Sequence, residues 1–209
     1  VFINNAENDV KSLLDEIQKD VKLSQVKIVS AFFNYKGFVK EFLENSINNK
    51  IKIDLITGSS PIHLNPTEAN TLFDKHKKNK SIFSLLRYKE TKNNPVLHSK
   101  FYLFYEKGKS HPSYFLFGSS NMSVSGFSIN YESNLFGTNT EILQILEKEL
   151  KNIPTTSFDP SIYKEKPKEE YAKRELGEDQ WNPFPYQQKI IDIIEKEFEK
   201  EDKGNVILP

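Results

Sequence analysis

The pattern of apolar and polar positions predicts alternating strands and helices from the start of the chain. Residues 26–33 form a nearly continuous apolar run with β-branched and aromatic side chains, which is typical of a buried strand. Residues 51–57 alternate apolar and polar positions before a turn, which predicts a second strand. Between them, residues 38–45 space three apolar side chains along one face of a helix. Strand, helix and strand at this spacing indicate a parallel pair joined by a crossover helix.

The same reasoning assigns elements as far as residue 151 and predicts an α/β fold. Pro66 lies near the start of one predicted helix, where proline is favoured, and Thr138 or Thr140 could cap the last one. The predicted helices cover residues 8–20, 66–78 and 140–151, and the further strands cover 84–88, 97–105, 113–117 and 131–136. We expect this domain to span residues 1–154.

The composition changes after residue 154. Residues 155–184 contain prolines among charged residues, which is typical of a solvated, partly extended linker. Residues 185–209 begin with a helix that has a stripe of isoleucines, and they finish with a short apolar segment that predicts a strand. The sequence therefore predicts one domain followed by a linker and a helical tail.

Composition narrows the class of protein. Of the 209 residues, 37% are hydrophobic and 28% are charged, as expected for a chain that folds in water. The chain has no cysteine, which excludes disulfides and thiolate metal sites and favours a reducing, cytoplasmic location. We find no apolar run of about 18 residues and no signal peptide, so no membrane association is expected.

The formal net charge is zero, but the charges are unevenly distributed. Residues 159–209 hold 9 of the 29 Lys and Arg residues and 13 of the 29 Asp and Glu residues, which leaves 20 and 16 in residues 1–158. This surplus of four positive charges makes Lys75, Lys77, Lys78 and Arg87 candidates for contacts with substrate phosphates. A solvated helix face is the alternative interpretation of the lysine run.

Two short polar segments at the ends of predicted strands carry the candidate chemistry. Strand alternation puts His98 and Lys100 on one face and Ser99 on the other, so a nucleophile lies beside a cation. Downstream, Gly118 allows a tight turn, after which Ser119, Ser120 and Asn121 offer hydrogen-bond donors to an anion. Together these groups could bind a phosphate.

The two segments resemble the signature of the phospholipase D superfamily, a His-x-Lys element followed by Gly-Ser-x-Asn. The stretch from Gly118 to Glu132 is similar to the nuclease branch of that superfamily. No Asp follows Lys100 at the usual distance, a feature shared by restriction-nuclease-like members. The resemblance implies a phospholipase D-like mixed β-sheet flanked by helices, present as a single repeat.

The resemblance also implies a mechanism. His98 would attack phosphorus to give a phosphohistidine, while a second imidazole protonates the leaving oxygen and then activates water. Lys100, Ser119 and Asn121 would stabilise the developing charge without a metal ion, and Glu132 would orient an imidazole. Two histidines are needed but the chain has one His-x-Lys element, so we expect a homodimer with a shared active site. His63, His76 and His111 are expected to have surface roles.

The tail resembles the start of a superfamily 2 helicase. In that family a Tyr-Gln element, here Tyr186 and Gln187, contacts adenine. No Gly-Lys-Thr loop is present, so ATP would act only in a longer protein. The two resemblances together imply a DNA endonuclease that forms the N-terminal part of a restriction or anti-phage nuclease-helicase. Two alternatives stay open: a catalytically idle DNA- or partner-binding module, and a phosphodiesterase for diesters other than nucleic acid.

Overall fold

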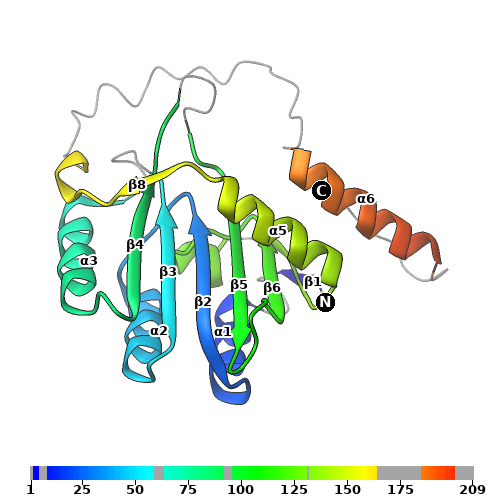
Figure 1. The fold of residues 1–209 in the computed structure, drawn as a ribbon, viewed down its shortest axis with the longest axis horizontal. Helices are drawn as coiled ribbons and strands as arrows, with labels where there is room; N and C mark the ends of the chain where they lie inside the picture. The colour runs from blue at the N-terminus through cyan, green and yellow to red at the C-terminus, as the bar shows by residue number, and fades with distance from the viewer. Residues whose placement is uncertain are drawn as a thin grey trace.

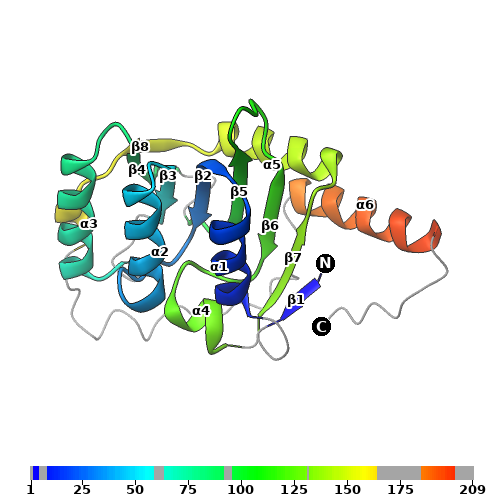
Figure 2. The same ribbon diagram turned by 90° about the horizontal axis from the view of Figure 1, so that it is seen from below.

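The computed structural model describes residues 2–4, 9–58, 64–91, 96–130, 132–163 and 185–200. Within these residues the chain forms an eight-stranded sheet in the order β1-β7-β6-β5-β2-β3-β4-β8, with helices on both faces (Figures 1 and 2). The strands are β1 (Phe2–Asn4), β2 (Leu23–Ser30), β3 (Lys52–Thr57), β4 (Phe83–Tyr88), β5 (Lys100–Glu106), β6 (Tyr114–Gly118), β7 (Ser133–Gly137) and β8 (Thr155–Ser157). The helices are α1 (Val10–Asp20), α2 (Gly37–Asn48), α3 (Pro66–Lys78), α4 (Val124–Ser128), α5 (Thr140–Asn152), α6 (Pro185–Lys200) and the 3₁₀ helix η1 (Pro160–Ile162).

The sheet is mixed, as expected. Strands β2, β3 and β4 are parallel, and helices α2 and α3 make the predicted crossovers between them. Strand β5 runs antiparallel to β2, and β6 and β7 continue the antiparallel half. As a result β2, β3, β4 and β6 all finish at the end of the sheet where β5 and β7 begin. We call this the upper end, because the arrows of β2 to β4 point to it in Figure 1.

Two apolar cores lie on the two faces of the sheet. Helices α1 to α4 cover one face, where Tyr102 and Phe104 of β5 are buried. Helices α5 and α6 cover the other face, where Phe101, Leu103 and Tyr105 are buried. Strand β5 is therefore buried on both sides, which explains why its sequence is apolar without alternation.

Most predicted elements are confirmed, with shifts of a few residues at their ends. Helix α3 begins at Pro66 as expected, whereas the cap of α5 is Asn139 and neither of the two threonines proposed for it. The strand predicted from residue 97 begins at Lys100. Strands β1 and β8 and helix α4 were not predicted, because each is too short to show a periodic pattern.

The domain extends beyond its predicted end at residue 154, so that prediction is wrong. Strand β8 pairs antiparallel with β4, and Phe158 and Tyr163 are buried in the core under α3. The Tyr163 hydroxyl also donates a hydrogen bond to the carbonyl oxygen of Gly58 at 2.6 Å. Long-range pairing thus extends the domain to Tyr163 despite a linker-like local composition. The remaining predictions of a linker, at 164–184, and of a strand near 209 fall outside the described residues.

Candidate active site

Three of the predicted catalytic side chains converge at the upper end of the sheet. Lys100 is the first residue of β5, Ser119 follows the last residue of β6, and Glu132 precedes the first residue of β7. The Ser119 hydroxyl donates a short hydrogen bond to Glu132 Oε2. Burial lowers the pKa of Lys100, and the negative charge of Glu132 partly offsets this effect. The pairing of three neighbouring strands therefore assembles a serine, a carboxylate and a cation.

Lys100 is a buried cation. Its side chain is only 6% exposed, and Nζ donates a hydrogen bond of 2.6 Å to the carbonyl oxygen of His98. Burial lowers the pKa of Lys100 to about 8, and the attraction of Glu132 opposes this change. The group is still mainly charged at neutral pH, in surroundings where a charge acts more strongly on a bound anion than it would in water.

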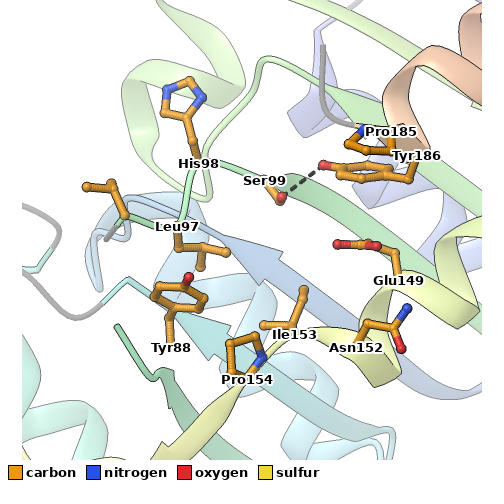
Figure 3. Close-up of a pocket in the computed structure, with 11 residues that line it drawn as sticks. Tyr88, Leu97, His98, Ser99, Glu149, Asn152, Ile153, Pro154, Pro185 and Tyr186 are labelled. Atoms are coloured by element: carbon orange, nitrogen blue, oxygen red, sulfur yellow. Dashed lines mark hydrogen bonds between the residues drawn. The ribbon is translucent and has the colours of Figure 1, made fainter. Parts of the chain in front are cut away.

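His98 lies at the rim of this site and is exposed. Its imidazole points away from Tyr88 and Pro154 (Figure 3). The pKa of His98 is lowered from its ordinary value, first by partial burial and second by the Lys100 ammonium. The ring is therefore mainly neutral at pH 7, which is the form that can act as a nucleophile.

The loop after Gly118 is fixed by hydrogen bonds within the protein. A Cβ atom at Gly118 would overlap the carbonyl oxygen of Ser133, so only glycine fits there. Asn121 Oδ1 accepts a hydrogen bond of 3.0 Å from the backbone N–H of Phe32, which orients the amide group of this predicted catalytic residue. The loop thus holds the side chains of Ser119 and Asn121 at the upper end of the sheet.

Ser120, predicted to contact substrate, has its side chain inside the protein. It is 1% exposed, and Ser120 Oγ donates to the carbonyl oxygen of Gly126 at 2.8 Å. Asn134 completes this network, because its Nδ2 donates to Ser120 Oγ at 2.8 Å and its Oδ1 accepts from the Ser120 N–H at 3.2 Å. This arrangement favours a role for Ser120 in supporting the loop and does not favour contact with substrate.

Sequence reasoning missed three supporting residues. Ser30, at the end of β2, accepts from the Met122 N–H at 2.8 Å and so ties the loop to the neighbouring strand. The Tyr102 hydroxyl donates to the carbonyl oxygen of Ser120 at 3.3 Å, and Asn134 is described above. Ser30 and Asn134 are polar residues inside otherwise apolar strand sequences. That signal could have identified them, because a buried polar side chain requires a partner.

The lysine run of α3 lies away from the site. Helix α3 leads into the start of β4, so its last turn is at the lower end of the sheet. Lys75 pairs with Glu44 at 2.9 Å and Lys77 pairs with Asp74 at 2.9 Å, while Lys78 is exposed. The structure therefore does not bring these predicted substrate contacts together with Lys100, and the alternative of a solvated helix face fits better.

Arg87 is nearer to the site. It is the penultimate residue of β4, and it is paired in register with Thr57 of β3 close to the upper end. Its Nε atom is buried and has no hydrogen-bond partner within the described residues. Of the four predicted basic contacts, Arg87 is thus the one that β4 brings to the end of the sheet occupied by Lys100.

The other histidines of the described residues lie at the lower end. His76 Nδ1 is 2.7 Å from the carbonyl oxygen of Phe83, the first residue of β4. His111, in the turn between β5 and β6, is 3.5 Å from Glu147. His63 lies outside the described residues. Neither His76 nor His111 can supply the second imidazole to the His98 of the same chain.

Tyr186 and Gln187, predicted to contact adenine, lie in the first turn of helix α6 beside the domain. The Tyr186 side chain is 8% exposed, and its hydroxyl donates to Ser99 Oγ at 2.8 Å (Figure 3). The tyrosine forms one wall of a cavity of about 430 Å³ that also reaches Glu149 and His98. Gln187 is half-buried. Their contact with a nucleotide stays a prediction.

In the part of the chain that the structure describes, no group of three or more His, Cys, Asp or Glu side chains could hold a metal ion. Nor is any described helix long and apolar enough to cross a membrane.

Solved structures with the same fold come from proteins with low sequence identity. NucT from Helicobacter pylori is 17% identical at a TM-score of 0.57, and the match covers 76% of this chain and 98% of that one. Nuc from Salmonella typhimurium, a phospholipase D family member, is 9% identical at a TM-score of 0.53, covering 73% of this chain and 91% of that one. Phosphatidylserine synthase from Haemophilus influenzae is 14% identical at a TM-score of 0.57, covering 96% of this chain and 46% of that one.

Curated proteins provide no matching relative. Residues 13–153, well over half of the chain, match the family described as cardiolipin synthase, PLD-like domain. The match includes both polar segments and the strands β2 to β7 that bring them together. The chain therefore belongs to the PLD-like domain family, which has the phosphodiesterase fold of the phospholipase D superfamily.

Proposed function

We propose that the protein is a metal-independent DNA endonuclease that cleaves phosphodiesters through a phosphohistidine at His98. The observation that carries this proposal is the buried ammonium of Lys100, held at the upper end of the sheet beside Glu132 and Ser119. A buried cation next to a neutral imidazole is suited to bind a phosphate and to attack it.

In the first step, a ring nitrogen of His98 attacks phosphorus and forms an N–P bond. The P–O bond to the leaving group breaks, and the leaving oxygen takes a proton from a second imidazole. Lys100 neutralises charge on the non-bridging oxygens, and the donors of Ser119 and Asn121 add hydrogen bonds to them. Lys100 and Asn121 are held by contacts within the protein and keep further N–H donors for the phosphate, whereas the Ser119 hydroxyl must turn its hydrogen bond from Glu132 to a phosphate oxygen.

In the second step, water attacks the phosphorus of the phosphohistidine. The second imidazole, now neutral, takes a proton from this water, and the N–P bond breaks to regenerate His98. Among the described residues, the other histidines lie at the lower end of the sheet, and the chain has one His-x-Lys element. The second imidazole is therefore proposed to be His98 of a second copy of the chain.

The choice of DNA as substrate has three supports. The segment from Gly118 to Glu132 resembles the nuclease branch of the superfamily, and two structures with this fold bear the names Nuc and NucT. Residues 1–158 carry a surplus of four positive charges, which favours a polyanion. The helicase-like start at Tyr186 and Gln187 supports a place in a longer nuclease-helicase that uses ATP.

The test is cleavage of supercoiled plasmid in the presence of EDTA. We expect the wild-type chain to cut, His98→Ala to lose at least about a hundredfold in rate, and His111→Ala to retain full activity. His111 is a matched control, since it is an exposed histidine at the lower end of the sheet. Wild-type protein that binds but never cuts would favour the idle module. Turnover of a chromogenic diester without DNA cleavage would favour a different diester substrate.

A further inference from the structure

The segment that carries His98 lies just outside the paired part of the sheet. The register between β2 and β5 begins with Ser30 opposite Lys100, so the ladder does not include His98 or Ser99. Leu97 is buried in the core under α5, and the Lys100 ammonium is bonded to the His98 carbonyl oxygen. The direction of the imidazole therefore depends on side-chain contacts of this segment.

Tyr186 provides such a contact from a distant part of the sequence. Its hydroxyl donates to Ser99 Oγ at 2.8 Å, and both side chains are buried. Its ring meets the ring of Phe117 of β6 edge-on, with centroids 6.3 Å apart. Ile190 and Ile193, four and seven residues further along α6, are buried in the same core. Helix α6 thus packs on the sheet with Tyr186 directed at the His98–Lys100 segment.

Ser99, which accepts the hydrogen bond from Tyr186, is the middle residue of the His98–Lys100 segment. Because side chains alternate in an extended segment, Ser99 points to the α6 face while Lys100 points to the opposite face. Figure 3 shows Ser99 directed to the Tyr186 hydroxyl and the His98 ring directed elsewhere. A hydrogen bond that holds Ser99 on the α6 face therefore also holds His98 and Lys100 in their directions on the opposite face.

We propose that Tyr186 is a positioning residue for the His98–Lys100 segment, so that helix α6 is part of the nuclease site. This inference rests on the function proposed above. It assigns the tyrosine of the tail a role toward the phosphodiester site, through Ser99, that does not depend on a nucleotide. Displacement of α6 would release Ser99 and leave the imidazole free to adopt unproductive directions.

The experiment compares Tyr186→Phe with Tyr105→Phe in the chain of 209 residues. Each variant keeps its ring and removes one buried hydroxyl, but the Tyr105 hydroxyl donates to Glu147, remote from His98. We expect Tyr186→Phe to lower kcat for diester cleavage about three- to tenfold with KM unchanged, and Tyr105→Phe to leave kcat unchanged. Ser99→Ala should lower kcat equally, and the double variant Tyr186→Phe/Ser99→Ala should show no further loss.

A second readout does not depend on activity. The pKa of His98, measured by NMR titration, should rise toward its ordinary value in Tyr186→Phe, because the released ring loses part of its burial and of its repulsion by the Lys100 ammonium. His76 serves as an internal reference in the same spectra. If the wild-type protein cleaves nothing but the pKa of His98 still rises in Tyr186→Phe, the positioning role is supported and the proposed function is refuted. An unchanged His98 pKa, or equal loss of kcat in the two Tyr→Phe variants, would refute the positioning role.

Discussion

Lys100 keeps a charged side chain at a buried position, and this environment sets the pH range of the proposed reaction. Cleavage of a diester whose leaving group needs no proton requires only a neutral His98 as nucleophile and a charged Lys100. The pKa of His98 lies below its ordinary value near 6.5, so neutral imidazole is lost only as the pH falls below that value. The pKa of Lys100 is about 8, so its charge is lost as the pH rises through that value. Between these two pH limits, around neutral pH, both groups are in the form that the reaction requires.

We therefore predict a bell-shaped profile of kcat/KM for a p-nitrophenyl phosphodiester. Its leaving group needs no proton, so the basic limb reports Lys100 and not a general acid. On this limb kcat/KM should fall near pH 8. In Lys100→Arg the fall should disappear, because a guanidinium stays charged. A profile that is flat to pH 10 in the wild-type chain would contradict the assignment of Lys100.

Glu132 has contacts beyond those predicted for it, and its orientation of an imidazole stays a prediction. Its carboxylate accepts hydrogen bonds from Ser119 and Asn130 and attracts Lys100. Glu132→Gln removes that attraction, so the pKa of Lys100 should fall further and the basic limb should move to lower pH. We expect at least about a threefold loss of kcat at pH 8, measured against Glu16→Gln, an exposed substitution on α1. An unmoved basic limb would refute this role.

The residues proposed to be catalytic could be identified from the sequence more fully than the residues that support them. His98, Lys100 and Ser119 stand in short motifs whose chemistry is visible in the residue types. The roles of Ser30 and Asn134 depend on partners about 92 and 14 residues away in the chain, which no local pattern shows. The prediction that the lysines of α3 contact substrate phosphates relied on local charge. Local charge does not reveal which end of a sheet a helix faces.

Elements with a long periodic pattern were predictable, and short ones were not. The crossover helices α2 and α3 bury regular apolar stripes, so their periodicity was informative. Helix α4 has only five residues, and its sequence of small and polar residues shows no stripe. Its position follows from packing, since Phe127 fills the core and Gly126 lies against the backbone of Asn121.

The contact between α4 and the Asn121 loop leads to a prediction about Gly126. A Cβ atom there would lie 2.5 Å from the backbone carbonyl oxygen of Asn121 and 3.0 Å from the backbone nitrogen of Asn121. The backbone must therefore move. We expect Gly126→Ala to reduce the free energy of unfolding by about 1–3 kcal/mol in urea denaturation and to lower kcat by displacing Asn121. Ser128→Ala, an exposed substitution in the same helix, should change neither quantity. Full activity and stability of Gly126→Ala would show that the loop tolerates the shift.

The whole molecule brings one set of polar groups to the upper end of one sheet, and the proposed chemistry needs two imidazoles. Pairing of two chains at the upper end would supply the second one. His98 is exposed there, and Ile129, 71% exposed, precedes Glu132 by three residues. An apolar side chain at this position is suited to an interface between copies, because pairing would remove it from water.

A shared site makes activity depend on the dimer. We predict that specific activity falls on dilution in parallel with the dimer fraction measured by sedimentation, and that Ile129→Lys shifts both curves to higher concentration. Excess His98→Ala should inhibit the wild-type chain, because mixed dimers hold a single imidazole, whereas excess His111→Ala should not inhibit it. A monomer with constant specific activity would refute the shared site. In that case, loss of activity in His63→Ala would identify His63 of the same chain as the second imidazole. The two-step chemistry requires a proton donor, and His98 cannot be both nucleophile and donor.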